Sequence, residues 1–160
     1  MMRKLALLAA LLATPAMAGD RVPLDGARAT LLAFEAGSGV SAPAEVPPGS
    51  DVPFRVGESC YGWRLSFAPL HNPVVIEEVL VLPGSAGRWT SDTITTVSPD
   101  MTSARTTVHV ERGAREASHS WCVADGDPEG DYVYIIYLGD RIVATLPFHV
   151  ASKPGDGESE

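Results

Sequence analysis

The chain has 160 residues, of which 45% are hydrophobic and 20% charged, and its 20 acidic and 12 basic residues give a formal net charge of −8. This length suits one domain that forms its own core without a metal or cofactor. A surface so acidic repels phosphate backbones and anionic headgroups, which argues against nucleic acids and membrane surfaces as partners.

Residues 1–18 have the three-part layout of a secretory signal peptide. Arg3 and Lys4 form a basic start, an apolar run follows, and Ala16-Met17-Ala18 supplies an A-x-A cleavage site. The apolar run is far shorter than the roughly 20 residues of a membrane-spanning helix, and no later segment comes closer. We therefore expect an exported protein, periplasmic or secreted, without a membrane span.

The mature chain expected after cleavage begins at residue 19. No cysteine stands directly after the cleavage site, so we expect no lipid anchor. Because Arg3 and Lys4 leave with the signal, ten basic residues remain against 20 acidic ones, a formal net charge of −10. An acidic surface of this kind is typical of a protein that stays in solution outside the cell.

Short apolar stretches bounded by Gly, Pro, Asp and Ser recur after residue 19, and helical periodicity is hard to find. This pattern predicts an all-β domain, an immunoglobulin-like antiparallel sandwich of seven or eight strands over 19–150. The predicted strands lie near 27–36, 58–68, 73–82, 104–112, 117–124, 131–138 and 141–150, with a weaker one around 88–97. Residues 37–53, rich in Gly, Ser and Pro, are expected to form a mobile loop, and 151–160 a disordered tail.

The last two predicted strands form the most specific local pattern. Gly139-Asp140 separates them, and Gly supplies the positive φ that a two-residue hairpin turn requires. Residues 132–138 (YVYIIYL) are apolar at both alternating sets of positions, which predicts a central strand covered on both sides or one that meets a partner.

Cys60 and Cys122 are the only cysteines. In an oxidising compartment such a pair favours a disulfide. Alternation places Cys60 opposite Tyr61 and Trp63, which we assign to the core, and Cys122 opposite Trp121. We therefore expect the disulfide to join neighbouring strands of one sheet on its outer side.

This arrangement would differ from the antibody pattern, in which the disulfide crosses the core. Gly130-Asp131-Tyr132 supplies the G-x-Y of that pattern, but the position two residues beyond the tyrosine is Tyr134 and not cysteine.

The common signatures of enzymes are missing from the sequence, including G-x-S-x-G, H-E-x-x-H, phosphate-binding glycine loops and C-x-x-C. We therefore assign no catalytic residues and expect no enzyme, with a hydrolase whose triad is assembled from scattered residues as an alternative. His71, His109, His119 and His149 are scattered singly without the spacing of a zinc site, and we expect structural, hydrogen-bonded histidines and no metal ligands.

An acidic segment at 125–131 (DGDPEGD) has alternating oxygen donors that superficially resemble a calcium loop. Asp125, Asp127, Glu129 and Asp131 are the candidate ligands. An EF-hand would place a glutamate at the twelfth position, where this chain has Ile136, and would have flanking helices. A solvated turn is the alternative that we favour, with calcium or small-ligand binding as a second hypothesis.

Aromatic residues could offer a flat surface for stacking sugars or peptides, although in a small sandwich most of them belong to the core. The exposed candidates are Trp89 and Tyr137. The full set is Tyr61, Trp63, Trp89, Trp121, Tyr132, Tyr134 and Tyr137.

Three stretches together resemble a family of small bacterial exported domains of unknown function. They are residues 52–63 (VPFRVGESCYGW), Leu82-Pro83, and the segment from Gly130-Asp131-Tyr132 to Phe148-His149-Val150. The resemblance covers about residues 27–150 and implies an immunoglobulin-like sandwich. It implies no activity and supplies no functional residues.

Export without catalytic signatures favours a non-catalytic binding or interaction module. Its partner would be an unidentified envelope or extracellular protein, contacted through an edge strand or the 37–53 loop.

Overall fold

The computed structural model describes residues 24–37, 43–89 and 94–152, and in this part of the chain the regular structure consists of strands. Four predicted segments lie wholly or partly outside the described residues. They are the signal peptide, residues 38–42 of the predicted loop, residues 90–93 of the weak strand and residues 153–160 of the tail. None of the described residues belongs to a helix long and apolar enough to span a membrane. The strands are β1 (Arg28–Glu35), β2 (Ala44–Val46), β3 (Asp51–Pro53), β4 (Ser59–Ser66), β5 (Val74–Val81), β6 (Thr95–Val97), β7 (Ser103–Val110), β8 (Glu116–Cys122), β9 (Gly130–Leu138) and β10 (Arg141–Ala151).

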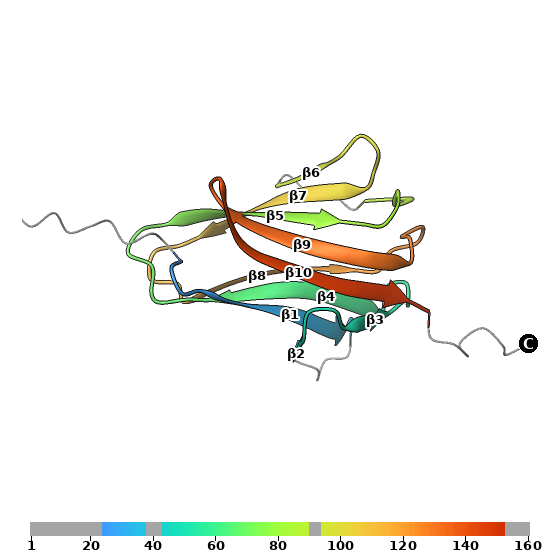
Figure 1. Ribbon diagram of the computed structural model, residues 1–160, viewed down its shortest axis with the longest axis horizontal. Helices are drawn as coiled ribbons and strands as arrows, with labels where there is room; N and C mark the ends of the chain where they lie inside the picture. Colours follow the sequence, from blue (N-terminus) through green and yellow to red (C-terminus); the bar gives the residue numbers. More distant parts are fainter. Residues whose placement is uncertain (1–23, 38–42, 90–93, 153–160) are drawn as a thin grey trace, which may run out of the picture.

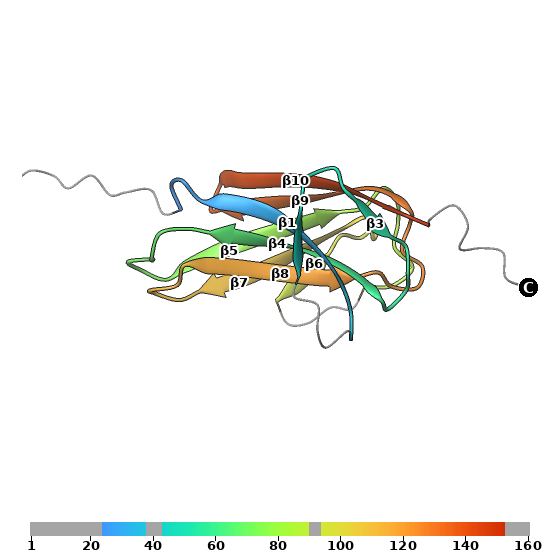
Figure 2. The same ribbon diagram turned by 90° about the horizontal axis from the view of Figure 1, so that it is seen from below.

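The strands form two sheets that face each other, and their apolar inner faces bury the core between them (Figure 1). One sheet has the order β2-β1-β4-β8 and the other the order β3-β10-β9-β5-β7-β6. Figure 2, a view from below, shows β1, β4 and β8 of the four-stranded sheet in front of the six-stranded one. Neighbouring strands are antiparallel except for β3, which runs parallel to β10.

The connections follow the immunoglobulin pattern. In a constant-type immunoglobulin domain strands A, B and E share one sheet, and C, F and G share the other. Here β1, β4 and β8 take the places of A, B and E, and β5, β9 and β10 those of C, F and G. The predicted immunoglobulin-like β-sandwich is therefore confirmed.

Ten strands are present among the described residues, more than the seven or eight predicted. The additional β2 and β3 lie in the 37–53 segment, so its prediction as a loop was wrong there. Both are three-residue edge strands separated by Pro47-Pro48, and β3 ends at Pro53. Their pairing with β1 and β10 is a tertiary contact, which has no periodic signature in so short a segment.

The predicted C-terminal hairpin is confirmed. Leu138 pairs with Arg141 across the Gly139-Asp140 turn, and Gly139 has φ +57°. A register shift between Ile142 and Ala144 marks a bulge that the sequence pattern did not indicate. β10 continues to Ala151, and the neighbouring Ser152 is hydrogen-bonded to Glu129.

Aromatic rings from both sheets fill one part of the core. Tyr61 from β4 lies within 4.9–6.2 Å of Tyr132, Tyr134 and Phe148, measured between ring centroids. The hydroxyl of Tyr132 donates to the carbonyl oxygen of Pro128 at 2.7 Å, which is the tyrosine corner typical of immunoglobulin folds. Burial is the main cause that raises the pKa values of the Tyr61, Tyr132 and Tyr134 hydroxyls, and neighbouring acidic groups raise them further. The hydroxyl of Tyr134 donates to the carbonyl oxygen of Tyr61 at 3.3 Å.

The disulfide joins Cys60 and Cys122, which are direct partners on the adjacent strands β4 and β8. It lies on the face opposite the core residues of both strands, as alternation predicted. Gly62, the next residue on this face, permits the close approach of the strands. A Cβ at Gly62 would lie 2.5 Å from the carbonyl oxygen of His119.

Candidate functional site

The most unusual interior residue is Glu78, a carboxylate with no exposed surface on the inner face of β5. Burying a carboxylate is costly unless hydrogen bonds replace its hydration. In this molecule three nitrogen donors do so, and all three come from the opposite sheet.

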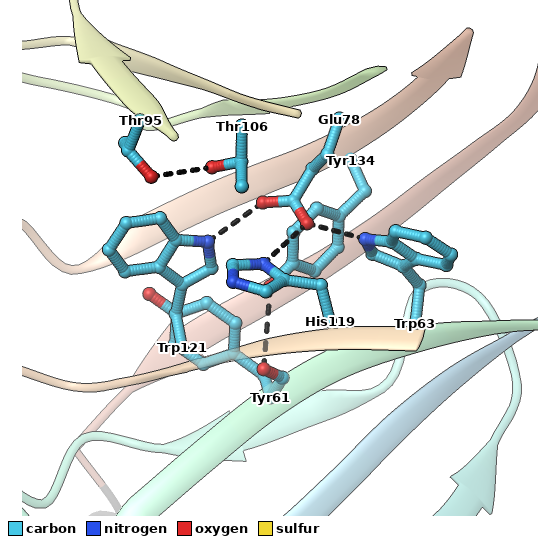
Figure 3. Close-up of polar contacts among 8 residues, drawn as sticks. All are labelled: Tyr61, Trp63, Glu78, Thr95, Thr106, His119, Trp121 and Tyr134. Carbon is cyan, nitrogen blue, oxygen red and sulfur yellow. Dashed lines mark hydrogen bonds and ion pairs between the residues drawn. The ribbon is translucent and has the colours of Figure 1, made fainter. Parts of the chain in front are cut away.

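Both oxygens of Glu78 are occupied (Figure 3). Oε2 accepts from Trp63 Nε1 at 2.5 Å and faces His119 Nδ1 at 2.8 Å, and Oε1 accepts from Trp121 Nε1 at 2.7 Å. A carboxylate oxygen only accepts, so we place the imidazole proton on Nδ1. The imidazole lies between the two indoles in Figure 3.

We call Glu78 and its three donors, Trp63, His119 and Trp121, the Glu78 cluster. Another aromatic side chain packs against it. Trp89 stacks edge-on against Trp121, with ring centroids 5.5 Å apart, and its indole N–H donates to the carbonyl oxygen of Met101 at 3.1 Å. The His119 side chain is 25% exposed. Glu78 therefore lies inside the sandwich, with His119 at the boundary to solvent.

The geometry of the Glu78 cluster indicates a structural role. Glu78 belongs to the six-stranded sheet, whereas Trp63 is on β4 and the other two donors are on β8, so the hydrogen bonds join the two sheets. A triad would additionally need a nucleophile within hydrogen-bond reach of the imidazole. The hydrolase alternative stays a prediction.

The predicted acidic segment at 125–131 directs its carboxylates to separate partners. Asp127 Oδ2 accepts from the backbone N–H of Ala124 at 2.8 Å, and burial raises the pKa of its carboxyl against the effect of this bond. Glu129 binds the backbone N–H and hydroxyl of Ser152, at 2.7 and 2.8 Å. Asp131 Oδ1 faces His149 Nδ1 at 2.8 Å, and Asp125 is exposed.

Within the described ranges, no three His, Cys, Asp or Glu side chains gather closely enough to hold a metal ion. The structure therefore does not bring the four predicted calcium ligands together. His71 and His109 are exposed on a loop and on β7, away from the Glu78 cluster.

The predicted aromatic surface is divided among several places. Tyr61, Trp63, Tyr132 and Tyr134 are buried in the core. Trp89 packs on Trp121, while Tyr137 lies on the outside of the other sheet, so the two predicted members of an exposed platform do not meet.

A hollow of about 410 Å³ lies at one end of the sandwich, beside the connection from β4 to β5. Residues 67–74 form most of its wall, and Leu24 and Asp25 complete it. Leu24 directly follows the part of the chain that the structure does not describe, so we assign no ligand to this hollow.

The outer face of the six-stranded sheet carries a continuous set of apolar side chains. Alternation turns Ile76, Glu78 and Leu80 of β5 inward, so their neighbours point outward. Register places Val79 opposite Ile135 and Val81 opposite Val133. These outward residues are partly or largely exposed and do not belong to the core. We define the outer apolar patch as Val79, Val81, Val133, Ile135, Tyr137 and Ile142.

No third layer of described residues covers this face (Figure 1). Ile142 is the most exposed large apolar side chain of the described chain, at 55%, and Val75 on the same face is 45% exposed. The sequence predicted that β9 is covered on both sides or meets a partner. The inner residues of β9 are buried and its outer ones are partly exposed, so β9 is not covered on both sides. That it meets a partner stays a prediction.

Two acidic side chains on the same face, Glu77 and Asp131, have side-chain partners. Arg105 Nη1 contacts Glu77 Oε2 at 2.6 Å, and the Arg105 guanidinium lies 5.8 Å from the centroid of the Tyr137 ring. At the other end of the face, His149 pairs with Asp131. The outer apolar patch therefore lies between the Glu77–Arg105 ion pair and the Asp131–His149 contact.

Comparison with known proteins gives a family and no activity. The model of the PM0630 beta sandwich domain family matches residues 31–151. No curated protein matches. An immunoglobulin-like protein from Pseudomonas aeruginosa is similar at 16% identity and a TM-score of 0.46, over 77% of this chain and 91% of that one. The alkylpurine DNA glycosylase AlkC from Pseudomonas fluorescens, bound to DNA containing an abasic site analog, is similar at 12% identity and a TM-score of 0.37, over 64% of this chain and 28% of that one.

Sequence reasoning missed Glu78 and the outer apolar patch as a unit. The strand sequence VVIEEVLV contains adjacent glutamates, and alternation requires that one of them point inward. That signal was available, but the three donors lie 15 to 43 residues away in the chain and only the fold brings them together.

Proposed function

We propose that this chain, which belongs to the PM0630 beta sandwich domain family, is a non-catalytic protein-interaction domain that acts outside the cytoplasm. The observation that carries the proposal is the outer apolar patch. Its partner is an apolar protein surface, because the patch itself is apolar and carries no charged side chain.

Isolated apolar residues on a surface need no explanation, but a contiguous group on adjacent strands marks a contact site. The patch joins three neighbouring strands, β5, β9 and β10, through the pairs Val79–Ile135, Val81–Val133 and Tyr137–Ile142. On a strongly acidic chain this face is the exception, and burying it against a partner removes the apolar area from water.

The Glu78 cluster supports a non-catalytic role. The buried carboxylate uses both oxygens on donors of the opposite sheet, so this group is engaged in holding the sandwich together. The disulfide supports export, since a cysteine pair of this kind persists in oxidising compartments.

The test is photo-crosslinking in the cell that produces the protein. A photoreactive residue is placed in the patch by Ile135→p-benzoylphenylalanine, and as a control on the opposite sheet by Ala44→p-benzoylphenylalanine, an exposed position of β2. We expect a protein adduct from position 135 and none from position 44. Absence of an adduct at 135, or equal labelling at both positions, would contradict the proposal.

A further inference from the structure

We infer that the protein surface bound by the outer apolar patch is a second copy of this chain, so that two six-stranded sheets pack face to face in a two-fold dimer. The inference rests on the proposed function and adds the identity of the partner. Three properties of the face support it, namely its charge balance, its register and its size.

The charge balance favours a like surface over a charged partner. Glu77 is paired with Arg105, and the six side chains of the patch carry no charge, so an acidic or basic partner finds no countercharge within the patch. Two copies can meet without burying an unpaired charge at the centre of the contact. Burying such a charge would be the most costly arrangement.

The register places the centre of the patch between β5 and β9. Val79 and Ile135 are direct cross-strand partners, and Val81 and Val133 form the next pair outward. A two-fold axis through this centre brings the same residues of the second copy opposite the first, as an isologous contact requires. Sheets that pack face to face lie about 10 Å apart, a gap that Val and Ile side chains from both copies fill.

The size of the face is at the lower limit for a specific dimer. The four long strands β7, β5, β9 and β10 are adjacent, and the shortest of them have 8 residues. At about 4.8 Å between strands and about 3.3 Å per residue they span about 500 Å² in flat projection. Two such faces bury about 1,000 Å² in total, the lower limit for a specific interface, so we expect a reversible dimer.

The net charge of the chain predicts how salt affects this dimer. Residues 19–160 carry a formal net charge of −10 per copy, and the patch itself contributes none of it, so the copies repel through charges elsewhere on their surfaces. Salt screens such charges beyond about 8 Å at physiological ionic strength and leaves apolar contact in place. Association should therefore strengthen as salt is added.

The experiment is analytical ultracentrifugation of residues 19–160 with the disulfide intact, from about 1 to about 200 µM, a span that covers micromolar dissociation constants. We expect a monomer–dimer equilibrium. Ile135→Lys should weaken it at least about 100-fold, about 2.8 kcal/mol. Ala44→Lys, which adds the same charge on the opposite sheet, should leave it unchanged. Ile135→Thr retains β-branching and should weaken it by a smaller factor, which covers the case that the lysine variant does not fold.

A monomer at every concentration would overturn the inference, as would a dimer that Ile135→Lys and Ile135→Thr leave intact. The crosslinked adduct separates this failure from failure of the proposed function. An adduct of twice the chain mass at position 135 agrees with the inference. An adduct of another mass, with the chain monomeric, leaves an interaction domain whose partner is a different protein.

Discussion

Replacing Glu78 by glutamine tests whether the hydrogen bonds of the buried carboxylate outweigh the cost of burying its charge. Glutamine has nearly the same shape, but only one of its terminal atoms accepts. The orientation that keeps most hydrogen bonds places the amide oxygen where Oε2 lies, so that Trp63 and His119 still donate to it. The amide NH₂ then faces the indole N–H of Trp121. Two donors then oppose each other inside the protein.

The magnitude follows from the lost contact. A hydrogen bond to a charged group contributes about 1.5–3 kcal/mol, and a buried donor without a partner costs about 1–3 kcal/mol. Loss of the charge relieves part of the desolvation cost of Glu78, so we expect Glu78→Gln to lower the free energy of unfolding by about 3 kcal/mol. In a domain of this size that lowers Tm by about 10 °C.

Thermal and urea unfolding followed by circular dichroism measure this change. Glu45→Gln is the matched control, because Glu45 is exposed and its nearest ion pair, to Arg64, is 3.5 Å long. Such a pair contributes about 0–1 kcal/mol.

A double-mutant cycle identifies the opposed donor. Trp121→Phe removes the indole N–H that faces the glutamine NH₂, so in the Glu78→Gln background it should cost about 1–2 kcal/mol less than in the native protein. Trp63→Phe should show no such relief, because its acceptor is retained. If Glu78→Gln is as stable as the native protein, the desolvation cost outweighs the hydrogen bonds and the reasoning is refuted.

Three further predictions concern the rest of the fold. Reducing Cys60–Cys122, with a sequence separation of 62 residues, should lower the free energy of unfolding by up to about 4 kcal/mol, measured by urea unfolding with and without reductant; no change would contradict the assignment of the disulfide as a stabilising crosslink. Gly126→Ala should lower the free energy of unfolding by at least about 1 kcal/mol more than Gly113→Ala, because both glycines have φ +84° but a Cβ at Gly126 would lie 2.9 Å from Gly87 Cα, whereas a Cβ at Gly113 would face open space. Equal losses of stability in urea unfolding would disprove the steric argument. Burial raises the pKa of Asp127, so the folded state binds the proton of this carboxyl more tightly than the unfolded state, and its contribution to stability falls as pH rises from the ordinary aspartate pKa through the raised value. The pH dependence of unfolding should lack this contribution in Asp127→Asn, and a profile equal to that of the native protein would show that Asp127 does not titrate in this way.

The sequence predicted the sandwich because its long strands carry their own signals. Strands β4, β5, β9 and β10 alternate or bury continuous apolar runs, and Gly139-Asp140 marks their clearest turn. Alternation also placed Cys60 and Cys122 on the outer face of neighbouring strands, which the pairing confirms. These features depend on local pattern alone.

The features that the sequence did not predict depend on tertiary neighbours. β2 and β3 are too short to show a period, and they exist because β1 and β10 offer backbone partners. The role of Glu78 depends on three donors from the opposite sheet, and the outer apolar patch depends on the register of β5 against β9. The apolar run at 132–138 predicted a strand that is covered on both sides or meets a partner, and only the fold showed which of its residues are partly exposed.

Nuclear magnetic resonance locates the contact directly, whatever the partner. An amide chemical-shift series is recorded while residues 19–160 are diluted across the micromolar range, and again while any crosslinked partner is added. We predict shifts at Val79, Val133 and Ile135 on the outer face of the six-stranded sheet and none along β1. Shifts confined to the β8 edge or to residues 125–131 would contradict the assignment of the outer apolar patch as the contact surface.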